Sequence, residues 1–196
     1  MTTRRTLLSA AALMPLPALA QGADPVAVVE RFHAALLAVM RDAQRLGARG
    51  RYDRLSSPMQ QSFDLAAMTR IAVGPSWNGF GAAEQQALTE AFSRWSVATY
   101  AARFDGYAGE SFTTTGIQAL PNGDVLVRTS LNRTGGQDPV VLSYLVRRGR
   151  IVDVYLTGTI SELASRRSEF SGILRDGGPT RLTNELNARS ARLLGA

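Results

Sequence analysis

The sequence predicts a single α+β domain, in which helices cover a four-stranded antiparallel sheet. Changes in hydrophobic period lead to this prediction. Residues 24–104 carry apolar side chains at helical spacing, whereas residues 111–157 alternate apolar and polar side chains in four short runs. A helical period returns after residue 158, so helices precede and follow the sheet and can cover its apolar face.

Residues 1–20 are predicted to be an export signal peptide and not part of the fold. They combine a basic start, an apolar run and small residues up to Ala20, which is the pattern of a cleaved signal. The paired Arg4 and Arg5 also occur in twin-arginine signals, so the export route stays open between that pathway and general secretion. We therefore expect one domain over residues 21–196, located in the periplasm.

Three helices are predicted before the sheet. The first begins at the Asp-Pro pair of residues 24–25, a typical N-cap and first helical residue, and has Gly47 as its expected C-terminal cap. The second begins at the Ser-Pro pair of residues 57–58 and ends before the "GPSW" of residues 74–77. The third spans about residues 82–104.

This third helix is apolar on two sides. One stripe contains Leu88, Phe92, Trp95, Thr99 and Ala102, and a second contains Val97, Tyr100 and Phe104. A helix that is apolar over so much of its surface must be buried on more than one side. It is either a central core helix or a helix with one side on the core and the other on a ligand.

The sheet is predicted to be a meander with tight turns. Asn122-Gly123 is a strong hairpin signal, because both central positions of a type I′ turn require positive φ. A further turn is expected at Arg148-Gly149, before the last strand.

A long helical region is predicted after the sheet. Thr159 and Glu162 form a capping-box pattern, which places the helix start at Thr159. The "RDGGPT" of residues 175–180 is expected to end this helix before a final amphipathic one.

The sequence offers little catalytic chemistry. It has one histidine, no cysteine and no lysine, which excludes histidine–thiolate zinc sites, Schiff-base chemistry and a Walker A motif. All 22 basic residues are arginines, scattered and without a nucleic-acid-binding motif, so nucleic acid is not an expected partner. We predict no metal, no cofactor and no enzymatic activity.

Three further stretches occur in order behind the export signal. They are "FDLAAMTRIAVGPSW" (residues 63–77), "AFSRWSVATYAARFDGYAGESF" (residues 91–112) and a strand–Gly–helix element over residues 152–170. Together they resemble the MlaC-type, toluene-tolerance family of periplasmic lipid carriers, with Asp153, Gly158, Arg167 and Phe170 in matching roles. Thr157 replaces the usual Glu, and one extra residue precedes the arginine, which is closer to the family's hopanoid-associated branch.

The resemblance implies a strongly twisted sheet wrapped by helices, with an apolar cavity between them for the acyl chains of a phospholipid or a hopanoid-type lipid. It also implies two partners: an inner-membrane ABC transporter with a lipid-binding ring, and an outer-membrane lipoprotein complex. The carrier would shuttle lipid between them.

On this basis the inward sheet face and the third helix are expected to line the cavity. The expected lipid-binding residues are Trp95, Val97, Tyr100, Phe104, Leu142, Tyr144, Val154, Leu156 and Phe170. Arg167 stands in an otherwise apolar stripe. It either pairs with a buried acceptor such as Asp153 or a strand carbonyl, or contacts a lipid phosphate or a partner at the cavity mouth.

Two other functions stay open. One is a non-catalytic adaptor without a ligand, which only binds protein partners. The other is a small enzyme on a cone-shaped α+β fold. Such an enzyme needs a polar group deep in its pocket, and the candidates are His33, Asp64, Asp105 and Asp153.

Overall fold

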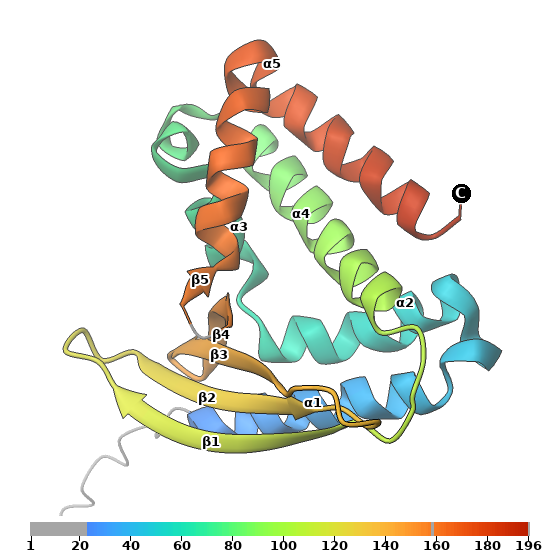
Figure 1. Ribbon diagram of the computed structural model, residues 1–196. Coiled ribbons are helices and arrows are strands. Elements are labelled where there is room, and N and C mark those ends of the chain that lie inside the picture. Colours follow the sequence, from blue (N-terminus) through green and yellow to red (C-terminus); the bar gives the residue numbers. More distant parts are fainter. Residues whose placement is uncertain (1–22, 158, 196) are drawn as a thin grey trace, which may run out of the picture.

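The computed structural model describes residues 23–157 and 159–195. The predicted signal peptide, the expected mature start at Gln21 and the family role of Gly158 lie outside the described residues. Within them the chain forms five α-helices, one 3-10 helix and a five-stranded antiparallel sheet with strand order β1-β2-β3-β4-β5 (Figure 1). The predicted α+β class is confirmed. No helix in this part of the chain has the length and apolar character that a membrane crossing requires.

The N-terminal half is helical. Its elements are α1 (Pro25–Arg41), α2 (Ala43–Ser62), α3 (Leu65–Val73), the 3-10 helix η1 (Gly74–Gly79) and α4 (Ala82–Arg103). The carboxylate of Asp24 caps α1 by accepting a hydrogen bond from the backbone N–H of Val26, as predicted. Asp64 caps α3 in the same way, through the N–H of Ala67.

Two predicted helix boundaries are wrong. The first helix ends at Arg41 rather than at Gly47, which instead kinks α2 with φ 62° and ψ −178°. Pro58 does not begin a helix but lies inside α2. Because Leu55 and Met59 on the same turns are fully buried, the packing of this face offsets the one hydrogen bond that proline removes.

The predicted meander is confirmed, and one short strand is added to it. The strands are β1 (Ser111–Ala119), β2 (Val125–Asn132), β3 (Val140–Arg147), β4 (Arg150–Leu156) and β5 (Ile160–Ser161). The type I′ turn predicted at Asn122-Gly123 is wrong, because only Gly123 has positive φ there. Pro121 fixes φ at a negative value and so favours a three-residue loop with a left-handed glycine. Positive φ at two successive residues occurs instead at Gly135-Gly136 and at Arg148-Gly149, where the second turn was predicted.

The last helix, α5 (Glu162–Leu193), begins after Ser161 and not at Thr159. Strand β5 pairs with the end of β4 and so delays the helix, and the Ser161 hydroxyl caps it by accepting a hydrogen bond from the N–H of Ala164. The two helices predicted on either side of residues 175–180 are the arms of α5, which bends sharply at Gly177–Gly178 (Figure 1).

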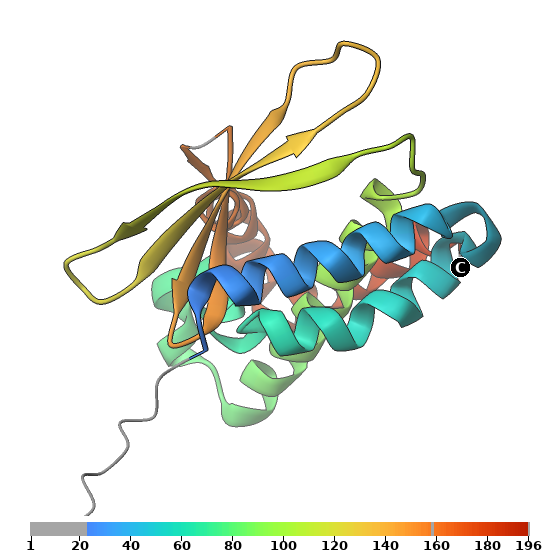
Figure 2. The same cartoon turned by 90° about the horizontal axis from the view of Figure 1, so that it is seen from below.

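The arrangement of the layers explains the two apolar sides of α4. Helix α1 lies across β1, β2 and β4, and the sheet is strongly twisted (Figure 2). Helix α4 packs mainly against α5, α2 and α3. It therefore has apolar neighbours on several sides.

Candidate functional site

An apolar cavity of about 120 Å³ lies between the sheet and the helices. Helix α4 supplies much of its wall, strands β3 and β4 face it, and the ends of α2, α3 and α5 complete it. The apolar and aromatic lining residues are Met59, Phe63, Leu65, Met68, Phe92, Trp95, Tyr100, Phe104, Leu142, Tyr144, Val154, Leu156 and Leu163. The polar ones are Ser96, Thr99, Arg103, Glu162 and Arg166.

Seven of the nine expected lipid-binding residues line this cavity. They are Trp95, Tyr100, Phe104, Leu142, Tyr144, Val154 and Leu156. The four strand residues form one patch, because Leu142 is paired with Leu156 and Tyr144 with Val154 across β3 and β4. Alternation along each strand then directs all four side chains to the same face.

Val97 and Phe170 do not line the cavity. Val97 lies two residues from Trp95, which turns its side chain about 200° around the helix. It is buried on another side of α4, at a separate groove that also involves Tyr52 and Ser56 of α2. Phe170 is fully buried behind the wall, with its ring centre 6.0 Å from that of Trp95.

The wall contributed by α2 and α3 was not among the expected site residues. Phe63 ends α2, and an isolated bridge pairs it with Ile151 of β4, so both helices are held at this edge of the sheet. Arg150 reinforces the junction by donating to the backbone carbonyls of Gln60 and Phe63. Phe63, Leu65 and Met68 are apolar, but no local signal in the sequence indicated that they face a cavity.

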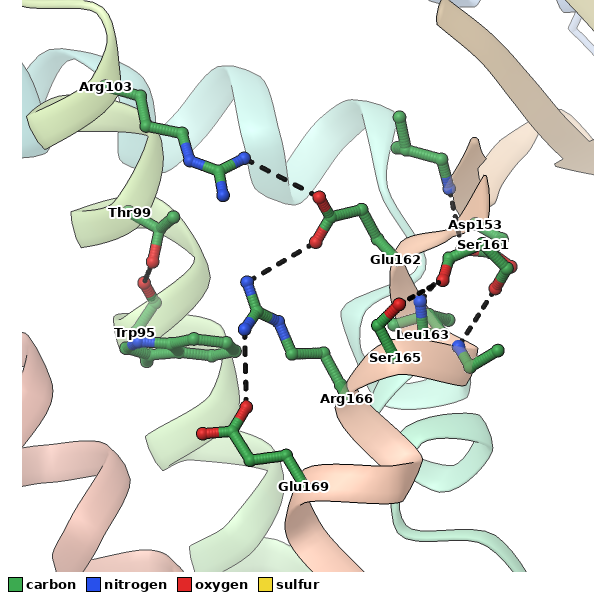
Figure 3. A network of polar contacts seen from close by, with 12 residues as sticks. Trp95, Thr99, Arg103, Asp153, Ser161, Glu162, Leu163, Ser165, Arg166 and Glu169 are labelled. Carbon is green, nitrogen blue, oxygen red and sulfur yellow. Dashed lines mark hydrogen bonds and ion pairs between the residues drawn. The ribbon is translucent and has the colours of Figure 1, made fainter. Parts of the chain in front are cut away.

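Charged side chains form a network where α4 meets the start of α5 (Figure 3). The carboxylate of Glu162 lies between two arginines, with Oε1 3.7 Å from Arg103 Nη1 and Oε2 3.4 Å from Arg166 Nη2. Arg166 also pairs with Glu169 at 3.3 Å, and its guanidinium carbon lies 4.7 Å from the ring centre of Trp95. Such a guanidinium over an aromatic face is a cation–π contact. The i, i+4 spacing of Glu162 and Arg166 was the sequence signal for this pair.

Arg167 is exposed and does not line the cavity. Its Nε and Nη2 atoms donate to the backbone carbonyl oxygen of Ile71, at 2.9 and 2.7 Å. Ile71 lies near the C-terminus of α3, where helix carbonyls lack intrahelical partners. The acceptor is therefore a helix carbonyl, and the expected pairing with Asp153 or a strand carbonyl is wrong.

Asp153 has other partners. Its carboxylate accepts hydrogen bonds from the Ser161 hydroxyl at 2.6 Å and from the N–H groups of Val154 and Leu163, at 2.8 and 3.3 Å. Burial raises the pKa of Asp153, although these hydrogen bonds oppose the effect. The residue therefore joins β4 to the first turn of α5.

His33 lies behind the cavity wall. It is 4% exposed, its Nε2 atom is 3.0 Å from the Tyr144 hydroxyl, and its ring stacks on Phe112 with centres 3.8 Å apart. Burial lowers the pKa of His33 to about 4 and raises the pKa of Tyr144. Both side chains are therefore uncharged at neutral pH.

The four residues considered as candidates for an enzyme lie outside the cavity lining. They are His33, Asp64, Asp105 and Asp153. Over residues 23–157 and 159–195, no group of three or more histidine, cysteine, aspartate or glutamate side chains is placed to hold a metal ion.

These features define a class of α+β protein in which helices close over a twisted sheet around an apolar cavity. The chain belongs to the MlaC family, whose model, described as MlaC protein, matches residues 30–188. Its fold is similar to that of a phospholipid-binding protein from Ralstonia solanacearum, solved in complex with a phospholipid. That match has a TM-score of 0.75 and 23% identity, and covers 87% of this chain and 99% of the other. A comparison with curated proteins finds no match.

Proposed function

We propose that this protein is a non-enzymatic periplasmic carrier that binds the acyl chains of a phospholipid. The observation that carries the proposal is the apolar cavity between the sheet and the helices, lined by aliphatic and aromatic side chains from six elements. Membership of the MlaC family and the phospholipid bound to the protein of similar fold support the same ligand class.

The physical reason for such a carrier is the cost of exposing acyl chains to water. Each buried methylene contributes about 0.8 kcal/mol, so two chains of about 15 methylenes gain about 24 kcal/mol on leaving water. A lipid therefore crosses an aqueous compartment only inside an apolar container. The container needs no catalytic group.

The cavity must widen to take up a lipid. Its volume of about 120 Å³ is below the roughly 300–1,000 Å³ of ordinary small-molecule pockets. Helix α4 packs mainly on other helices, and the ion pair between Arg103 and Glu162 joins it to the start of α5. We expect these two walls to move apart when lipid enters.

The proposed route runs between an inner-membrane ABC transporter with a lipid-binding ring and an outer-membrane lipoprotein complex. The family resemblance supports these partners, and the pattern of residues 1–20 supports export to the compartment between them. A hopanoid-type lipid is the alternative cargo, because residues 157–167 are closer to that branch of the family.

The test is native mass spectrometry of the protein exported to the periplasm and purified without detergent. We expect a complex with one phospholipid, identified by extraction of the same sample into organic solvent. A hopanoid in the extract would change the cargo. A protein that carries no lipid, even after incubation with phosphatidylethanolamine and phosphatidylglycerol vesicles, would contradict the carrier function and favour an adaptor.

A further inference from the structure

The charged groups of the cavity lining are confined to one edge. Arg103 lies on the last turn of α4, and Glu162 and Arg166 lie on the first turns of α5. The walls formed by α2, α3 and the sheet are apolar, apart from Tyr144, whose hydroxyl is engaged by His33. A lipid with its chains against the sheet would therefore have its polar end between α4 and α5.

The two arginines at this edge come from different helices and share one carboxylate. Figure 3 shows Glu162 between them. Its contacts of 3.7 and 3.4 Å are longer than the roughly 2.7–2.9 Å of a strong charge-assisted hydrogen bond. Glu162 therefore holds the arginines in place but satisfies neither fully.

The two arginines differ in freedom. Arg166 is 23% exposed and is fixed by Trp95 and Glu169. Arg103 is 54% exposed, and within the part of the chain that the structure describes its ion-pair partner is Glu162 alone. One arginine is thus preorganised, and the other can turn toward a ligand.

We propose that Arg103 and Arg166 bind the phosphate group of the lipid at the cavity mouth, and that Glu162 takes the place of this phosphate when the cavity is empty. The proposal rests on the proposed lipid-carrier function and names the site for the headgroup. Guanidinium groups match phosphate oxygens in geometry as well as charge. A displaced Glu162 remains in the first turn of α5, where the helix dipole stabilises a negative charge.

The first test compares two ligands with identical acyl chains, phosphatidylglycerol and diacylglycerol, by competition in native mass spectrometry. We expect the parent protein to prefer phosphatidylglycerol. Arg103→Gln should weaken phosphatidylglycerol binding about tenfold and leave diacylglycerol binding unchanged. Arg166→Gln should also weaken phosphatidylglycerol binding. Arg103→Gln is the decisive variant, because Arg166 also packs on Trp95 and its loss could disturb the cavity wall.

Arg94→Gln is the matched control. Arg94 lies on α4, pairs with Glu90 and Asn187, and is not part of the cavity lining. It should change neither affinity. If it weakens phosphatidylglycerol binding as much as Arg103→Gln does, general charge attraction explains the effect and the site is wrong.

Glu162→Gln tests the displacement. Because it removes the competing carboxylate but keeps a side chain of similar shape, it should strengthen phosphatidylglycerol binding severalfold and leave diacylglycerol binding unchanged. A purely structural role of Glu162 predicts weaker binding of both ligands, and that result would overturn the proposed displacement.

The remaining outcomes separate this inference from the carrier function. Equal binding of phosphatidylglycerol and diacylglycerol by the parent protein would overturn the phosphate site and leave lipid carriage intact. Binding of neither would overturn both proposals. Inorganic phosphate is titrated into the lipid-free protein by calorimetry, and binding as tight as that of phosphatidylglycerol would assign the site to free phosphate instead.

Discussion

The space between the sheet and the helices is filled under α1 but hollow beside α4. Under α1, the side chains of Val29, Phe32 and Leu36 are fully buried and do not line the cavity. Beside α4, Trp95 and Tyr100 line a cavity instead. Helix α1 lies directly on three strands, whereas other helices hold α4. The comparison shows that similar apolar residues form solid core or cavity wall according to which neighbour supports their helix.

The largest expected effect is in the filled region. Phe32→Ala should lower the free energy of unfolding by about 3–5 kcal/mol, because it removes a fully buried aromatic ring. Phe104→Ala, at the cavity, should lower it by less than half as much, because Phe104 is only partly buried and already borders open space. Urea denaturation of both variants measures this difference. Equal losses would mean that the two regions do not differ.

The buried His33 should make the filled region sensitive to acid. Its pKa is about 4 in the folded protein and about 6.5 when unfolded, so the unfolded state binds more protons between these values. The contribution of His33 to the free energy of unfolding is therefore fully present above pH 6.5. It is lost as the pH drops toward 4, and the total loss is about 3 kcal/mol.

The measurement is the free energy of unfolding of the parent and of His33→Gln from pH 7.5 to pH 3.5. The variant should lack this part of the pH dependence, while other titrating groups such as Asp153 contribute equally to both proteins. Identical pH profiles would show that His33 is not held neutral by burial.

Arg167 should contribute to stability and not to lipid binding. Arg167→Met removes the hydrogen bonds to the carbonyl of Ile71, and we expect a loss of about 1 kcal/mol because the side chain is exposed. Lipid loading should stay the same. Arg175→Met, an exposed arginine on the same helix, serves as the control. Unchanged stability with lost lipid would favour the headgroup role for Arg167.

The smallest expected effect on stability is at the sheet face of the cavity. Val154→Trp and Leu142→Trp should change the free energy of unfolding by less than about 1 kcal/mol, because the added atoms enter open space. Both variants should fold as compact monomers and carry less lipid than the parent.

Val127→Trp provides the matched control for these variants. Val127 is fully buried on the neighbouring strand and does not line the cavity. The substitution should therefore lower the free energy of unfolding by about 1–3 kcal/mol through overpacking. Thermal melts and native mass spectrometry compare the three proteins. Unfolding of both cavity variants would contradict the cavity assignment.

Short sequence patterns were sufficient to predict the long strands and the start of the first helix. Alternation predicted the four long strands, and the Asp-Pro pair predicted the start of α1. The same signals failed at Pro58, where burial of one face of α2 outweighed the usual disruption of a helix by proline. They also failed at Asn122, where the preceding proline favours a turn other than type I′. In both cases the surroundings of the residue outweighed its own preference: the buried face of α2 for Pro58, and the fixed φ of Pro121 for Asn122.

The sequence by itself determined the order of helices and strands, the two apolar sides of α4 and the scarcity of catalytic side chains. Only the tertiary structure decided which residues face the cavity. Val97 and Trp95 both belong to apolar stripes of α4, and burial against a helix and exposure to a cavity leave the same hydrophobic pattern. Likewise Arg166 and Arg167 differ by about 100° around α5. Arg166 faces α4 and lies at the cavity mouth, whereas Arg167 faces α3 and donates to the carbonyl of Ile71.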